Sequence, residues 1–194
     1  MPDIYPRRVV HTPSADTPSG PDPAAPLGWQ RAIAQAIIDA GVESAVYVPD
    51  ARLRGIVASL ADGGLEPLAL TREEECVGYA AGYIAAGGRA VVLMQCSGLG
   101  NALNALGSFA IPYALGIPLI LSMRGTLGEA NPSQVPMGRA TVGLLDALSV
   151  QSFPVAVAEE AGETAAGVLR LAFETGVPAA LILEPQLGGQ RESV

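Results

Sequence analysis

Polar residues follow directly after an apolar run near the middle of the chain, in a pattern that could bind a ligand. The run AVVLM leads into Gln95-Cys96-Ser97-Gly98-Leu99-Gly100-Asn101. Glycines after a strand let a backbone approach another group closely. The polar side chains need hydrogen-bond partners if the turn is buried, and a ligand could supply them. We therefore predict a ligand-binding turn at residues 95–101.

Two other interpretations of this turn remain open. Gly98 and Gly100 could begin a dinucleotide-binding fingerprint, G-x-G-x-x-G. Leu103 occupies the position of the third glycine, however, and the preceding strand is not the first of the chain. Alternatively, the turn could merely connect a strand to a helix, which would leave the polar set, including Asn104, without an assigned partner.

The second candidate is a carboxylate, Glu73, in the segment EEECVGYAAGYIAAGG. Acidic residues are favoured in the first turn of a helix, so a row of glutamates can be a solvated helix start. Glu73 differs from the two that follow, because helical spacing places it on one face with Val77, Ala80 and Ile84. A carboxylate that extends an apolar face needs a dedicated partner. Glu73 is therefore expected to have such a partner, unlike the two glutamates that follow it.

Glu74 has a structural interpretation instead. Thr71 and Glu74 have the spacing of a capping box at a helix N-terminus. Further along the same segment, Gly78 and Gly82 would allow another helix to approach closely.

The third candidate is an anion site in MRGTLGEANPSQVPMGR, which we expect to be a long loop. It carries Arg124, Gln134 and Arg139. An arginine at the carboxyl end of a strand suits a carboxylate, sulfonate or phosphonate, because its guanidinium can donate two parallel hydrogen bonds. We predict that these three residues bind the substrate, with an ordinary surface arginine as the alternative.

The elements that must position these residues follow from alternating helix and strand patterns. Helices are predicted at 27–41, 52–64, 73–88, 99–110, 139–148 and 159–176, and strands at 44–50, 66–70, 89–95, 117–123, 151–157 and 178–185. Several strands lack polar alternation and must be buried on both faces. This pattern predicts an α/β fold with a doubly wound parallel sheet flanked by helices. All three candidate segments then lie at the carboxyl ends of strands, where such sheets bind ligands.

Three regions are expected along the chain. Residues 1–26 form a proline-rich tail that we predict to be disordered, residues 27–187 form one domain, and residues 188–194 form a C-terminal tail. The tail has no signal-peptide core, and no apolar run is long enough to span a membrane. The only histidine, His11, lies in this tail.

Composition limits the classes of partner. The net charge of −8 makes nucleic acid an unfavourable partner. Charged residues make up only 15% of the chain, against about 25% in typical domains, which indicates that part of the surface is covered by another subunit. Cys76 and Cys96 lack metal-ligand spacing and are expected to be small buried hydrophobes in a cytoplasmic protein.

Three quoted segments together resemble a known domain. TREEECVGYAAGY, AVVLMQCSGLGNALNAL and GIPLILSMRG are similar to the pyrimidine-binding (PYR) domain of thiamine-diphosphate enzymes. The resemblance covers residues 27–187. It is closest to the alpha subunits of sulfopyruvate decarboxylases and to the related phosphonopyruvate decarboxylases, and PSQVPMGRAT favours the first of these.

The resemblance implies specific roles. Glu73, nine residues before Gly82, matches the glutamate that bonds N1′ of the thiamine diphosphate pyrimidine and promotes loss of the thiazolium C2 proton. The resemblance thus makes Glu73 the predicted catalytic residue. The cofactor then accepts the electrons released with carbon dioxide. The predicted cofactor-binding residues are Glu73, Gln95, Ser97, Gly98, Leu99 and Asn101.

The resemblance also implies a second chain. The family's diphosphate and magnesium motif, G-D-G followed by N, has no match here, and the nearest string, ADGG at 61–64, does not fit. Thiamine diphosphate and Mg²⁺ would therefore be held jointly with a beta subunit, in an α2β2 complex or a larger one. The expected reaction is decarboxylation of a small anionic 2-keto acid, with sulfopyruvate first and phosphonopyruvate second. A thiamine-dependent carboligase and a non-catalytic Rossmann-like module that binds a nucleotide or partner remain alternatives.

Overall fold

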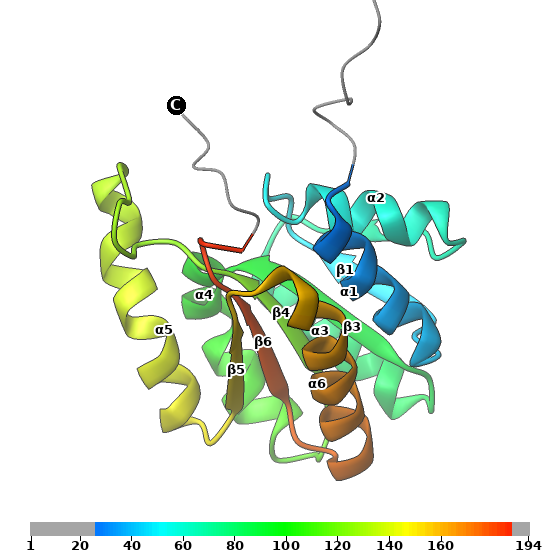
Figure 1. The fold of residues 1–194 in the computed structure, drawn as a ribbon. Coiled ribbons are helices and arrows are strands. Elements are labelled where there is room, and N and C mark those ends of the chain that lie inside the picture. Colours follow the sequence, from blue (N-terminus) through cyan, green and yellow to red (C-terminus); the bar gives the residue numbers. More distant parts are fainter. Residues whose placement is uncertain (1–25, 188–194) are drawn as a thin grey trace, which may run out of the picture.

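A computed structural model describes residues 26–187 of the chain (Figure 1). Of the predicted N-terminal tail, residues 1–26, only Pro26 is described. The predicted C-terminal tail, residues 188–194, lies outside the described residues. Across the described range, the helices do not reach the combination of length and hydropathy that crossing a membrane requires.

Six strands form one sheet in which all neighbouring strands are parallel. Their order is β2-β1-β3-β4-β6-β5, so the chain reverses direction across the sheet between β1 and β3. The strands are β1 (Ser44–Tyr47), β2 (Leu68–Ala69), β3 (Ala90–Gln95), β4 (Pro118–Ser122), β5 (Gln151–Val155) and β6 (Ala179–Leu183). The predicted doubly wound parallel sheet is therefore confirmed.

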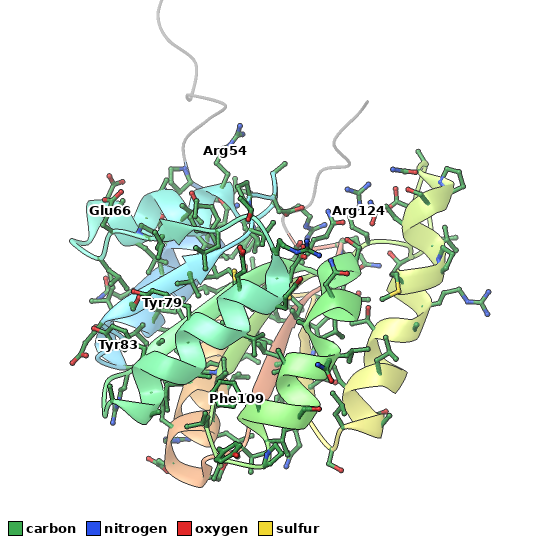
Figure 2. The ribbon with its side chains drawn as sticks, turned by 180° about the vertical axis from the view of Figure 1, so that it is seen from behind. Arg54, Glu66, Tyr79, Tyr83, Phe109 and Arg124 are labelled. Carbon is green, nitrogen blue, oxygen red and sulfur yellow. The ribbon has the colours of Figure 1, made fainter. Side chains whose placement is uncertain are left out.

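Helices cover both faces of the sheet. One face carries α1 (Gly28–Asp39), α2 (Arg54–Asp62) and α6 (Ala161–Thr175), and the other carries α3 (Glu73–Ala85), α4 (Leu99–Ala105) and α5 (Val135–Ala147). Figure 1 shows α1 and α6 in front of the sheet, and Figure 2 shows α3, α4 and α5 from behind. Short 3₁₀ segments are η1 (Cys96–Gly98), η3 (Pro132–Gln134) and η4 (Ala158–Glu160), and η2 (Leu106–Ala110) is a π-helical extension of α4.

Two apolar clusters fill the space between the sheet and its helices. Strand β3 shows the division clearly, because Val91 and Leu93 belong to one cluster while Val92 and Met94 belong to the other. Side chains alternate between the faces of a strand, and the sheet therefore needs apolar residues at nearly every central position. This is why the central strands are continuous apolar runs.

One boundary differs from the prediction in a way that affects the site. Helix α5 begins at Val135, whereas the sequence predicts a loop up to residue 139. Pro136 was interpreted as a loop residue, but proline is well tolerated in the first turn of a helix. Arg139 therefore lies on α5 and not in the loop with Arg124 and Gln134.

Candidate functional site

The carboxyl edge of the sheet collects the predicted site residues. Asp50 follows β1, the 95–101 turn follows β3, and Arg124 follows β4. Figure 2 shows Arg124 at this edge, close to the beginning of α5. Because all six strands are parallel, these segments meet at one end of the sheet, as the sequence predicts.

Glu73 is the first residue of α3 and lies next to the turn after β3. Asn101 Nδ2 donates a hydrogen bond to Glu73 Oε2 at 3.0 Å. Oε1 of Glu73 accepts no hydrogen bond, and Glu73 forms no ion pair, within residues 26–187. Val77 and Ala80 on the same face of α3 are buried, so the predicted apolar face is confirmed. On this chain the partner of Glu73 is an amide and not a cation.

Gly98 explains why the turn contains glycine. Its backbone has ordinary helical angles, φ −72° and ψ −19°. A Cβ at Gly98, however, would lie 2.3–2.4 Å from Cγ, Cδ and Oε1 of Glu73, which is too close for any side chain to be accommodated without movement. The group that closely approaches the turn is thus the Glu73 side chain. The turn and the start of α3 form one unit.

The predicted capping box is wrong. The N-cap of α3 is Arg72, one residue after Thr71. From that position the Thr71 hydroxyl donates to Glu75 Oε2 at 2.9 Å, and Arg72 Nε pairs with Glu74 Oε1 at 2.7 Å. Glu74 and Glu75 therefore have partners on the surface, which sets Glu73 apart from both.

Asp50 is a residue of this edge that the sequence interpretation missed. Gln95 Nε2 donates to Asp50 Oδ2 at 2.8 Å, while Ser122 Oγ and the Arg52 backbone N–H donate to Oδ1 at 3.1 and 2.9 Å. Ser97 Oγ donates to Gln95 Oε1 at 2.6 Å. Asp50 thereby connects β1, β3 and β4 at the point where the strand order reverses.

The signal for Asp50 was available in the sequence. An acidic residue at the carboxyl end of the first strand, in SAVYVPD, lies at the position where open α/β sheets bind ligands. The network also gives Gln95 and Ser97 partners within the chain. Leu99 is fully buried in the core, so only its backbone is available to a ligand.

Replacing Asp50 with alanine is expected to destabilise the chain by about 1.5–3 kcal/mol, because the Gln95 amide and the buried Ser122 hydroxyl lose an ionised acceptor. Urea unfolding of the purified chain measures this change. Asp62→Ala is the control, since Asp62 is exposed at the end of α2 and should stay within about 0.5 kcal/mol of wild type. Equal stability of the two variants would contradict the assigned network.

Arg124 is held by a second carboxylate of its own loop. Arg124 Nε and Nη2 donate to Glu129 Oε2 and Oε1, both at 2.8 Å. The backbone N–H groups of Gly125 and Asn131 donate to the same carboxylate at 3.2 and 3.0 Å. Hydrogen bonds from Arg124 lower the pKa of Glu129, and hydrogen bonding to Glu129 raises the pKa of Arg124. The sequence interpretation did not foresee this pair.

The other predicted substrate residues lie on either side of the start of α5. The backbone of Gln134 packs against Gly125. A Cβ added to Gly125 would lie 2.4 Å from the Gln134 carbonyl oxygen. Gln134 Oε1 is buried without a hydrogen-bond partner in the described part of the chain. Arg139 is exposed one turn into α5. The structure therefore packs the Gln134 backbone against Gly125, the neighbour of Arg124, and places Arg139 on α5 and not in the loop.

Both cysteines are buried free thiols, as predicted. Burial raises the pKa of Cys76 to about 12, with the carboxylates of Glu73 and Glu75 adding to the effect. Burial also raises the pKa of Cys96. Both thiols are therefore protonated near neutral pH and behave as small apolar side chains.

Comparison with known proteins identifies relatives over most of the chain. Residues 29–124 match the family model described as thiamine pyrophosphate enzyme, N-terminal TPP binding domain. The sulfopyruvate decarboxylase subunit alpha of Methanococcus maripaludis is 35% identical over 81% of this chain and 95% of its own length. The subunit alpha of Methanothermobacter thermautotrophicus is 40% identical over 75% of this chain and 89% of its own.

A longer relative and a solved structure extend this picture. The sulfopyruvate decarboxylase of Methanosarcina acetivorans is 30% identical over 76% of this chain, but only 38% of that protein is covered. The 2-oxoglutarate:ferredoxin oxidoreductase of Magnetococcus marinus aligns with a TM-score of 0.61 over 82% of this chain and 29% of its own, at 14% identity. At that identity the likeness shows the fold alone.

The family match over residues 29–124 includes both Glu73 at the start of α3 and the glycine turn after β3. The resemblance inferred from the sequence segments is confirmed at the level of the family. The chain belongs to the family of sulfopyruvate decarboxylase alpha subunits, among the thiamine pyrophosphate enzymes.

Proposed function

We propose that this chain is the PYR subunit of a two-chain, thiamine-diphosphate-dependent decarboxylase of sulfopyruvate. The reaction consumes one proton and converts the 2-keto acid into the corresponding aldehyde and carbon dioxide. The observation that carries the proposal is Glu73, a partly exposed carboxylate at the carboxyl edge with one oxygen free of any hydrogen bond within residues 26–187. A cytoplasmic location is part of the proposal, because both cysteines are free thiols.

The residues around Glu73 fit the cofactor's pyrimidine. A ring nitrogen needs a carboxylate that is oriented and not neutralised by a cation, and Glu73 meets both conditions. Asn101 holds Oε2, and Gly98 leaves the space that the side chain occupies. When bound, thiamine diphosphate supplies the electron sink for decarboxylation. Glu73 would exchange a proton with N1′ through its free Oε1.

The remaining predicted cofactor contacts are assigned different tasks. Gln95 and Ser97 are tied into the Asp50 network and would fix the shape of the turn. Asn101 would orient the Glu73 carboxylate, while the backbone of Gly98 and Leu99 would contact the cofactor's pyrimidine. Water exclusion would come from the partner subunit.

Arg124 and Gln134 are the proposed contacts for the acidic group of the substrate. The proposal is supported by the position of Arg124 at the carboxyl edge and by the packing of its neighbour Gly125 against the Gln134 backbone. Arg124 is partly exposed, with 34% of its side chain accessible, so it can reach a ligand. Arg139 remains a predicted contact that would require the ligand to extend along α5.

A beta subunit is expected to cover the outer face of α3, α4 and η2. Residues 90–123 contain no charged side chain, and Tyr79, Phe109 and Tyr113 are exposed. Figure 2 shows Tyr79 and Phe109 on this same side of the molecule. The alpha-subunit relatives match this chain along most of their length, whereas the Methanosarcina enzyme is much longer. We propose that the part of the Methanosarcina enzyme outside this match corresponds to a partner subunit. That subunit would hold the diphosphate and Mg²⁺ in an α2β2 complex.

Reconstitution tests this proposal. The purified chain, supplied with thiamine diphosphate, Mg²⁺ and sulfopyruvate, is expected to release no carbon dioxide. Turnover should appear when a subunit with the G-D-G…N motif is added, because that subunit supplies the diphosphate-binding half of the site. Full turnover by the single chain would contradict the two-chain assignment. An acyloin in place of the aldehyde would identify a carboligase.

A further inference from the structure

The Arg124–Glu129 pair has a geometry that leaves part of the arginine unused. Glu129 takes the Nε and Nη2 donors on one edge of the guanidinium. Nη1 donates no hydrogen bond to any residue of the 26–187 range. A guanidinium is planar and carries five N–H donors, so it can bind oxyanions along more than one edge. The edge that contains Nη1 is therefore available to a ligand.

Several further contacts hold the pair in place and so fix the orientation of the free edge of Arg124. Glu129 accepts four hydrogen bonds, two from Arg124 and two from backbone N–H groups, and only 9% of its side chain is exposed. The backbone is fixed from the other side, because Gly138 of α5 packs on Arg124; a Cβ there would lie 2.0 Å from the Arg124 carbonyl oxygen. An incoming anion would have to break four bonds to displace Glu129.

The charges near Arg124 bear on which anion the free edge prefers. Hydrogen bonding to Glu129 is the main cause of the raised pKa of Arg124, and the negative charges of Glu129 and Asp50 add to it. Arg124, Glu129 and Asp50 together carry one net negative charge. A sulfonate brings one negative charge, whereas a phosphonate brings nearly two near neutral pH, as phosphate groups do. The second charge is repelled more strongly.

We propose that Glu129 is a positioning and specificity-determining residue, which holds Arg124 with its free edge toward the substrate and disfavours a phosphonate relative to a sulfonate. The inference rests on the proposed function, because it takes the acidic group of the 2-keto acid as the ligand of Arg124. It assigns no chemical step to Glu129. Its effect passes through the orientation of Arg124 and the local charge.

Two substitutions of Glu129 separate these two effects. Glu129→Gln removes the charge, and its amide N–H₂ cannot accept from Arg124. Glu129→Asp keeps the charge but is one methylene shorter, so it cannot hold Arg124 as firmly. The experiment measures kcat and KM of the reconstituted complex with sulfopyruvate, phosphonopyruvate and pyruvate, which lacks the second acidic group. Glu66→Gln is the control, because Glu66 is exposed and lies on the opposite side of the molecule from Arg124 (Figure 2).

Glu129→Gln is expected to raise KM for sulfopyruvate by roughly 10- to 100-fold with little change in kcat, the range for losing an oriented charge-assisted contact. The preference for sulfopyruvate over phosphonopyruvate, as a ratio of kcat/KM, should fall about tenfold. Glu129→Asp should raise KM for both anions and leave their ratio unchanged. Pyruvate turnover should stay within about twofold of wild type in both variants.

Four results would overturn the inference. A lower KM for sulfopyruvate in Glu129→Gln would show that Glu129 competes with the substrate. An unchanged preference would remove the charge effect, and an equal loss with pyruvate would assign Glu129 to the stability of the loop. If Glu129→Gln does not fold, the Glu129→Asp measurement decides, and an unchanged KM there sinks the positioning role. A wild-type complex that turns over neither anionic acid would instead overturn the proposed function, and this inference with it.

Discussion

Replacing Glu73 with glutamine is expected to lower turnover of the assembled enzyme by about 10²–10⁴-fold, the range for loss of a positioned acid–base group. Glutamine has the same size and could keep the contact with Asn101. It cannot exchange a proton with the pyrimidine nitrogen. The direct measurement is the rate at which the C2 proton of bound thiamine diphosphate exchanges with deuterium in the complex.

The two neighbouring glutamates provide matched controls for this prediction. Glu74 forms an ion pair with Arg72 near the surface, and Glu75 is exposed. Surface pairs contribute little, so Glu74→Gln and Glu75→Gln should leave the exchange rate within about twofold of wild type. If one of these slowed exchange while Glu73→Gln did not, the register of the motif would be wrong. If none of the three slowed it, the role of Glu73 toward the cofactor would fail.

Replacing Gly98 with alanine should reduce kcat by roughly 10²-fold, although no reactive atom is removed. The new Cβ would collide with Cγ, Cδ and Oε1 of Glu73 at 2.3–2.4 Å, and misplacement of a catalytic group by about 1 Å can cost this much. The backbone angles of Gly98 suit alanine, so the fold should persist. Kinetics of the complex, together with the thermal melting curve of the chain, check both expectations.

Gly100, two residues further along in α4, offers the matched control. A Cβ there would lie 3.1 Å from Cε of Met137, the flexible end of that side chain, which can move aside. Alanine is also favoured over glycine within helices by up to about 1 kcal/mol. Gly100→Ala should therefore keep activity within about twofold. Full activity in Gly98→Ala would mean that Glu73 is not held over the turn in the way described.

Local patterns predicted the sheet because parallel strands buried on both faces are continuous apolar runs. Ala90 to Gln95 and Pro118 to Ser122 have this character, and both are central strands. Glu73 was also predictable, because its position relative to Val77 and Ala80 depends only on helical spacing. Family resemblance then selected the same residue independently.

Features that depend on tertiary contacts were missed. Asp50 acquires its importance from Gln95 and Ser122, which are 45 and 72 residues away in the sequence. No periodicity encodes such pairs. The pairing of Glu129 with Arg124 depends on the course of a loop. The error at the start of α5 arose because proline is common both in loops and in the first turn of a helix. The capping box failed by one residue, within the usual uncertainty of helix boundaries.

The outer face of α3, α4 and η2, which has few charges and several exposed aromatic side chains, has a consequence for the chain in the cell. A newly made copy without its beta subunit presents exposed aromatic side chains on a surface that lacks charge over residues 90–123. Such surfaces promote self-association and capture by quality-control factors. Its steady-state amount would then be limited by the supply of partner rather than by its own synthesis. Balanced production of both subunits, as from adjacent reading frames, would be selected for the same reason.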